Sequence, residues 1–281
     1  MVRHAGDRSP AGAVLSRAAV AEVDAFRAQC AGLAALAPEL GPVAVDVGAL
    51  TVLGVRGWPD HPWANAVVGL GAALPVREPE LDEALALLSE LGARAPYVTA
   101  EERAAPRLLL PQWLAARGLT APTRLVRLLA PTRDPGGRSD LRVVVAGPEL
   151  AEDVVRVCEQ GFGPGPELWW RAALGRPGWA QVLAYDGAEP IATAALHVNG
   201  ETAYAGAATT VPRARGKGAH AALVAARLRL AGEQGARHVA AKATPGSVSQ
   251  RNLERAGFCA LGAVVQWRRP APAAPAGRRG T

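Results

Sequence analysis

Residues 211–219 read Val-Pro-Arg-Ala-Arg-Gly-Lys-Gly-Ala and lie between a predicted strand over 202–211 and a predicted helix over 219–235. Pro212 lacks a backbone donor and so ends the strand. The Ala-, Leu- and Arg-rich composition that follows favours a helix, and Gly235 is a suitable stop for it. Glycine lets a ligand approach the backbone closely, and the first N–H groups of a helix attract anions. The stretch therefore predicts a phosphate-binding turn.

Two other interpretations of this turn stay open. A basic, glycine-containing turn is also a common solvated loop. A dinucleotide-binding turn is the second alternative, because Gly216, Gly218 and Ala221 have the spacing of such a motif. The strands ahead of the turn are joined by hairpins, however, and the next strand ends at residues 242–244 with no acidic residue for a ribose. Both features disfavour a dinucleotide site.

The turn resembles the acetyl-CoA pyrophosphate loop of the GNAT superfamily of N-acetyltransferases, in the pattern Arg213-x-x-Gly216-x-Gly218 followed by Ala219. In that family the loop joins the fourth strand to the third helix. The resemblance implies that acetyl-CoA is the co-substrate and that an acetyl group passes directly to a primary amine of a small molecule or a peptide. It implies cofactor contacts at Thr210, Val211, Arg213, Arg215, Gly216, Lys217, Gly218 and Ala219.

The second half of the chain, residues 140–270, follows the GNAT order of elements. Its predicted short helix over 247–256 ends in Gly-Phe, as in the family, and the resemblance places Ser249 and Asn252 against the cofactor. A helix-surface role for Asn252 is the alternative. The family's tyrosine, which often protonates the leaving thiolate, is replaced by Leu253. The usual proton donor is therefore missing.

The first half, residues 1–130, repeats this order in weakened form. Its corresponding turn, residues 69–75, has no Arg-x-x-Gly-x-Gly pattern and no cation before Arg77. We hypothesise a duplication whose first copy lost its cofactor loop and serves as scaffold or as one wall of the acceptor cleft. The alternative is an unrelated α/β domain. A structure without the splayed strand pair in the first half would exclude the duplication.

The predicted fold class follows from these two halves. It is α/β (α+β), with a mixed, mostly antiparallel central sheet flanked by helices, which is the acyl-CoA N-acyltransferase fold in duplicate. Residues 131–139 are rich in turn-forming types and are the predicted linker between the domains. Residues 271–281 are the predicted disordered tail.

Tyr204 and Glu167 are the predicted catalytic residues. Tyr204 lies on the strand before the turn and is a candidate proton relay, while Glu167 is placed to attract an amine. The family often uses a carboxylate beside this strand, but none occurs within residues 204–210. Glu159 and His197 are further candidates by proximity. A structural or surface role is the alternative for Glu159, Glu167 and His197, and a half-buried strand tyrosine is the alternative for Tyr204.

Trp169 and Trp170 follow a Gly- and Pro-rich segment. They predict either an aromatic wall for an apolar or cationic substrate or core residues, and because neighbours point to different faces we expect one of each. Because the usual acid and base are both missing, a non-catalytic acyl-CoA-binding regulator is the rival function.

The chain has 281 residues, a net charge of +6 and abundant Ala, Arg, Gly and Pro. This composition raises the isoelectric point by itself, and no nucleic-acid motif is visible, so a nucleic-acid partner is not expected. Cys30, Cys158 and Cys259 are far apart, which favours buried free thiols and no metal site. No signal peptide or membrane-spanning run is visible, so we expect a cytoplasmic protein without a membrane partner. No particular oligomeric state is predicted.

Overall fold

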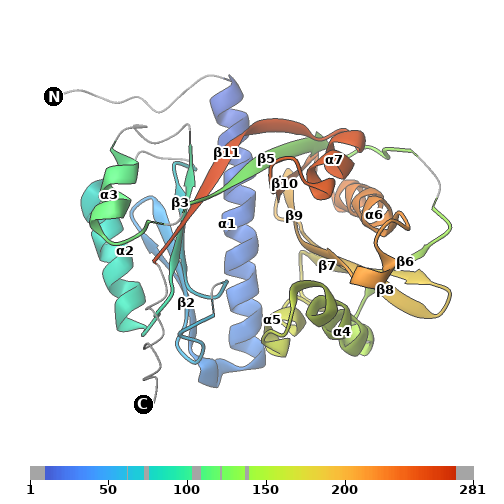
Figure 1. The fold of residues 1–281 in the computed structure, drawn as a ribbon, viewed down its shortest axis with the longest axis horizontal. Helices are drawn as coiled ribbons and strands as arrows, with labels where there is room; N and C mark the ends of the chain where they lie inside the picture. The colour runs from blue at the N-terminus through green and yellow to red at the C-terminus, as the bar shows by residue number, and fades with distance from the viewer. Residues whose placement is uncertain are drawn as a thin grey trace, which may run out of the picture.

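One sheet of eleven strands runs through the computed structural model, which describes residues 10–61, 63–72, 76–102, 109–120, 122–136 and 139–269. Helices cover both ends of this sheet, and the long helix α1 stands between them (Figure 1). The strand order is β1-β2-β3-β4-β11-β5-β10-β9-β8-β7-β6. The predicted tail, residues 271–281, lies outside the described residues.

The first half contributes five strands, three α-helices and one 3₁₀-helix within its described residues. They are α1 (Pro10–Leu36), η1 (Pro38–Leu40), β1 (Pro42–Val47), β2 (Leu50–Val55), β3 (Ala66–Leu70), α2 (Glu78–Glu90), β4 (Tyr97–Glu101), α3 (Leu110–Ala116) and β5 (Thr123–Pro131).

The described residues of the second half contribute the other six strands, four α-helices and two 3₁₀-helices. They are β6 (Arg142–Ala146), η2 (Pro148–Leu150), α4 (Ala151–Phe162), α5 (Glu167–Arg171), β7 (Trp179–Asp186), β8 (Glu189–His197), β9 (Thr202–Thr210), η3 (Pro212–Ala214), α6 (Ala219–Glu233), β10 (His238–Ala243), α7 (Val248–Arg255) and β11 (Cys259–Arg268).

Each half contains one parallel strand pair joined through a helix. β3 and β4 are parallel with α2 between them in the chain, and β9 and β10 are parallel with α6 between them. The other neighbouring pairs in the sheet are antiparallel. The predicted mixed, mostly antiparallel sheet is therefore confirmed. The parallel pair recurs in both halves, as the duplication requires, although β3 and β4 pair again after an irregularity between Val67 and Leu70 and do not stay apart as β9 and β10 do.

The two halves exchange their last strands. β5 ends the first half but pairs with β10, whereas β11 ends the second half and pairs with β4. β5 and β11 also pair with each other at the centre of the sheet. The division at residues 131–139 stays a prediction, but the exchange makes one sheet of both halves.

Helix α1 packs on the second half as well as on its own. Small residues such as Ala18, Ala21 and Ala25 are buried on it, which brings its axis close to the sheet. A Cβ at Gly32 would lie 2.0 Å from the carbonyl oxygen of Ala172, directly after α5. This close approach brings α1 into contact with α5 of the second half.

The segment before β3 is held in turns. Asn65 accepts from the Val55 amide and donates to the Trp58 and His61 carbonyls, and the strand therefore begins at Ala66. Cys259 is exposed, while Cys30 and Cys158 are buried as expected. Among the described residues, no helix is both long and apolar enough to cross a membrane.

Candidate functional site

The turn before α6 has the backbone that its glycines allow. Gly216 and Gly218 have φ values of +87° and +80°, a region that other residues rarely adopt. A Cβ at either position would meet no protein atom within 4 Å, so conformation and not crowding requires glycine here. α6 begins at Ala219, and the first N–H groups of a helix have no intrahelical acceptor. The turn therefore presents backbone donors at the positive end of a helix dipole.

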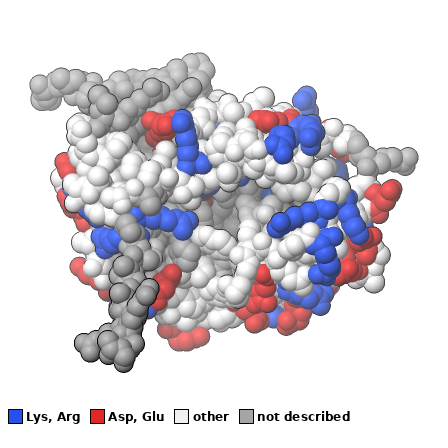
Figure 2. All heavy atoms as spheres, in the orientation of Figure 1, with Lys and Arg blue, Asp and Glu red and all other residues white. Residues whose placement is uncertain are grey.

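The three cationic side chains of the turn differ in their partners. Arg213 binds Gln160 at 2.8 Å and also pairs with Glu189, and Lys217 pairs with Asp186 at 2.6 Å. Arg215 is exposed and has no ion pair within the described part of the chain. Figure 2 shows basic and acidic side chains interleaved on this side of the molecule. Arg215 is thus the cation most available to an anion.

Thr210 and Val211 position the turn. Thr210 pairs with Ala192 in the sheet, and the amide of buried Val211 donates to the Ile191 carbonyl at 2.9 Å. The Val211 amide is therefore already satisfied and is not a free donor for a ligand. Ala219 is buried at the first turn of α6, where its small side chain allows close packing.

Strand β9 separates from β10 where it passes the site. The two strands pair from Thr202 to Ala205, and beyond this point β10 pairs only with β5. At the separation β9 has an irregular register against β8, and Ala207 has a φ of +45°, alone among the described non-glycine residues in being positive. Such a bulge turns the backbone away from the regular ladder. The sequence held one signal for it, Gly206 within a predicted strand.

A buried arginine lies behind this bulge. Arg227 of α6 is 3 % exposed and donates to the carbonyl oxygens of Ala195 and Gly206, each at 3.4 Å. Burial lowers its pKa to about 10, so it stays charged at neutral pH. It forms no ion pair in the described ranges. The guanidinium therefore adds a buried positive charge beside the separated strands, which the helical pattern of the sequence did not reveal.

Ser249 and Asn252 meet at one residue that the sequence did not single out, His220. The Oγ of Ser249 lies 3.4 Å from His220 Nε2, and Nδ2 of Asn252 lies 3.2 Å from Nδ1. An amide N–H on Nδ1 makes that nitrogen the acceptor, so Nε2 carries the proton and donates to Ser249. Ser249 and Asn252, the two predicted cofactor contacts, therefore both contact His220, which lies in the first turn of α6.

Between pH 7 and pH 5 the free energy of unfolding of His220→Gln is expected to fall less than that of the wild-type protein. Burial, and next the charge of Arg227, lower the pKa of His220 from 6.5 to about 4. Between these values only the unfolded chain binds the proton, so the free energy of unfolding falls as pH falls through this window. At pH 5 this protonation of the unfolded chain lowers the free energy of unfolding of the wild type by about 1–2 kcal/mol. Chemical unfolding of both proteins at the two pH values measures it, and equal pH effects would contradict it.

An aromatic cavity of about 270 Å³ adjoins the bulge and lies between the two halves. Gly206 and Ala207 reach it from β9, and α1 lines it from the first half. The described residues of the lining are Ala25, Phe26, Gln29, Trp63, Tyr97, Phe162, Trp169, Trp170, Ala173, Trp179, Gln181, Ala195, Tyr204, Gly206, Ala207 and Gln266. The first half therefore forms one wall of this cavity, and its role as a wall of the acceptor cleft stays a prediction.

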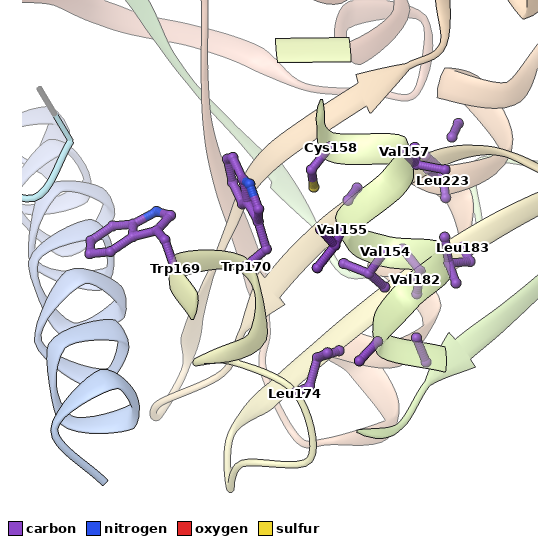
Figure 3. Close-up of a cluster of buried hydrophobic side chains, with 14 of the residues drawn as sticks. Val154, Val155, Val157, Cys158, Trp169, Trp170, Leu174, Val182, Leu183 and Leu223 are labelled. Carbon is purple, nitrogen blue, oxygen red and sulfur yellow. The ribbon is translucent and has the colours of Figure 1, made fainter. Parts of the chain in front are cut away.

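Trp169 and Trp170 are both buried and both line the cavity. Figure 3 shows Trp169 pointing from α5 toward α1 and Trp170 pointing in another direction. The two neighbouring tryptophans thus have different orientations, as expected. Both belong to the buried core and both also form the wall of the cavity, so the two alternatives do not exclude each other.

Tyr204 lies in the cavity wall and is tied to a buried charge network. Its hydroxyl donates to Glu22 Oε1 at 3.3 Å, and Glu22 also pairs with Arg127 at 2.7 Å and with Lys242. Burial, and next the charge of Glu22, raise the pKa of Tyr204 well above 10. The phenol therefore stays protonated at neutral pH and acts as a hydrogen-bonding group.

Glu167 lies outside the cavity lining. It is on the surface at the start of α5 and pairs with Arg171, which also binds Glu152 at 2.5 Å. His197 is buried against Trp179, with ring centroids 4.8 Å apart, and burial lowers its pKa. Glu159 is exposed. No carboxylate and no histidine is among the described residues that line the cavity.

The matching turn of the first half contains its own anion. Glu80 is buried at the start of α2, accepts from the Arg77 amide at 3.1 Å and is bonded by the Ala49 backbone. Burial opposes its charge, but these bonds and the Arg77 guanidinium lower its pKa below the usual 4.5. The strands β3 and β4 also pair again at Leu70 and Ala100, beyond their irregularity. A diphosphate at this helix start would be repelled by Glu80, in contrast to the start of α6, which carries no acid in its first turn.

Glu80→Gln is expected to lower the free energy of unfolding at pH 7 by about 1 kcal/mol, because the amide loses charge-assisted bonds at a helix start. A carboxyl with a lowered pKa stabilises above its unfolded pKa, so the difference from the wild type should shrink as the pH falls below 4.5. Chemical unfolding measures it. Glu83→Gln, at an exposed position of the same helix, is the control, and an equal loss there would refute the explanation.

The comparisons with known proteins agree with this geometry. The sequence matches no protein-family model and no curated protein. A GCN5-related N-acetyltransferase from Kribbella flavida aligns with a TM-score of 0.66 and 19 % identity, over 92 % of this chain and 96 % of that chain. A putative acetyltransferase of the GNAT family from Novosphingobium aromaticivorans aligns with a TM-score of 0.55 and 18 % identity, over 82 % and 91 %.

A tandem GNAT protein from the clavulanic acid biosynthesis pathway aligns with a TM-score of 0.54 and 18 % identity, over 82 % of this chain and 80 % of that chain. At these identities the likeness shows the fold. The chain has the acyl-CoA N-acyltransferase fold of the GNAT proteins. It carries this fold twice in tandem, and the first copy is degenerate.

Proposed function

We propose that this protein is an acyltransferase that moves an acetyl group from acetyl-CoA to a primary amine. The observation that carries the proposal is the alignment of three features along β9. The anion-binding turn follows the strand, the strand separates from β10 at Gly206, and the aromatic cavity opens at Gly206 and Ala207. A diphosphate at the turn and a thioester at the bulge would leave the cavity for the amine. The GNAT neighbours in the structural comparison support the same activity.

In the proposed reaction the amine nitrogen bonds to the thioester carbon, the carbon–sulfur bond breaks, and the amine loses a proton while the thiolate gains one. An amine such as that of Lys has a pKa of about 10.4 and must first be neutral. Because Tyr204 stays protonated and no carboxylate lines the described cavity, we assign that first deprotonation to water. The charge of Arg227 behind the bulge would favour the negative charge that develops on the thioester oxygen.

Release of free thiol from acetyl-CoA tests this proposal. The full chain is incubated with acetyl-CoA and a panel of primary amines, and the thiol and the acetylated amine are both measured. Formation of both in equal amounts is expected with at least one amine. Thiol release without an acetylated amine is hydrolysis and would contradict the transfer.

A non-catalytic acyl-CoA-binding regulator is the second candidate. It is favoured by Leu253, which is buried in the apolar core where the family usually has its tyrosine acid. Acetyl-CoA binding in a calorimeter, without thiol release for any amine of the panel, would support this role in place of catalysis.

A further inference from the structure

We propose that the acceptor is an arylalkylamine, which is a small monoamine with an aromatic and otherwise uncharged body. This inference rests on the proposed acyltransferase function and adds the substrate class to it. Three properties of the cavity carry it, namely its aromatic walls, its lack of charged groups and its size.

The aromatic walls come from both halves and contact one another. Trp63 of the first half meets Trp170 edge-on with 5.5 Å between ring centroids, and it meets Phe162 at the same distance. Phe162 stacks on Trp170 at 5.4 Å and 14°. Gln29 of α1 donates to the Trp169 carbonyl and connects α5 to the first half. Rings held in this way offer flat apolar surface to an aromatic body, and their faces attract an ammonium group.

The polar groups of the lining are neutral. They are the amides of Gln29, Gln181 and Gln266, the hydroxyls of Tyr97 and Tyr204, and the indoles of Trp63, Trp169, Trp170 and Trp179. The indole N–H groups of Trp170 and Trp179 are buried without a partner in the described chain. Among the described residues of this lining a carboxylate would find no cation, and a second ammonium would find no carboxylate. Amino acids and polyamines should therefore be poor acceptors, because an unpaired buried charge is costly.

The size of the cavity agrees with this class. A protein cavity of about 150 Å³ holds benzene. The cavity here is about 270 Å³, which leaves room for one ring and a short aminoalkyl chain that reaches toward Gly206 and Ala207. A peptide or a large glycoside would not be enclosed by it.

The test compares three amines with the full chain and acetyl-CoA. They are phenethylamine, phenylalanine, which adds a carboxylate to the same body, and spermidine, which has further ammonium groups and no ring. We expect kcat/KM for phenethylamine to exceed both others by about 100-fold or more, since a missing charge partner costs at least this much. A preference for phenylalanine or spermidine would overturn the inference while the acyltransferase proposal stands.

Variants of Trp63 test whether the preference for phenethylamine depends on the cavity. Trp63→Ala should raise KM for phenethylamine about tenfold, and Trp63→Phe should restore most of the affinity because it keeps an aromatic face. Trp113→Phe, on α3 outside the lining, is the matched control and should leave KM unchanged. Equal KM values for Trp63→Ala, Trp63→Phe and the wild type would overturn the assignment of the site.

Calorimetry with phenethylamine separates the two proposals if no amine releases thiol. Saturable binding that Trp63→Ala weakens would support the substrate site although catalysis has failed. No binding to the wild-type protein would overturn the inference.

Discussion

Arg127→Met is expected to lower the free energy of unfolding by about 3–5 kcal/mol, because it leaves buried carboxylates without their cation. Arg127 is 1 % exposed on β5, at the centre of the sheet, and binds Glu22 of α1 at 2.7 Å and Glu101 of β4 at 2.9 Å. Burial alone would lower its pKa, but the charges of Glu22 and Glu101 outweigh this and raise it. Chemical unfolding of the variant and the wild type measures the loss.

The network around Arg127 makes this effect specific. Lys242 of β10 pairs with Glu22, and although burial opposes the charge of Glu22, Lys242 and Arg127 together lower its pKa. With Arg127 removed, Lys242 remains as the single cation that this network offers to two acids. α1, β4, β5 and β10 all contribute to this network, so its loss should loosen the junction of the two halves.

Two controls separate this network from a general effect of losing an arginine. Arg124→Met is on the same strand, but Arg124 is 62 % exposed and pairs with Glu102, so its loss should be below about 1 kcal/mol. Burial raises the pKa of Glu101, which means that its charged form is disfavoured in the fold, and Glu101→Gln should stay close to the wild type at pH 7. If Arg127→Met lost no more stability than Arg124→Met, the network would not stabilise the junction.

Gly216→Glu is expected to weaken CoA binding by about 100-fold or more, which corresponds to about 2.7 kcal/mol. The substitution places a negative charge where the proposed diphosphate meets the start of α6, and it forces a side chain onto a residue with a φ of +87°. Calorimetric titration with CoA measures the affinity. A variant that binds as tightly as the wild type would show that the diphosphate lies elsewhere, and the proposed function would fail with it.

Gly235→Glu is the matched control for this experiment. Gly235 follows the other end of the same helix, has a φ of +88° and, like Gly216, has no atom within 4 Å of an added Cβ. Both variants should lose a similar amount of stability, on the order of 1 kcal/mol for a strained backbone. CoA affinity should be unchanged in Gly235→Glu, so an equal loss in both would point to backbone strain in place of a binding site.

The candidate site was predictable only in part. The turn at residues 211–219 was found because its glycines, proline and cations are neighbours in the chain. His220 was missed because its partners, Ser249 and Asn252, are on another helix. Glu167 was predicted to attract an amine, yet the fold pairs it with Arg171 at the surface. Its catalytic role stays a prediction, because Glu167 is not among the residues that line the cavity.

The sequence by itself determined the strands, helices and turns of both halves, because the spacing of apolar residues and the placement of Gly and Pro act over a few neighbouring residues. Only the tertiary structure decided the exchange of β5 and β11, the buried group around Arg127 and the aromatic cavity between the halves. Each of these joins residues that are far apart in the chain. Their pairing depends on packing and on the burial of charge, which no local pattern records.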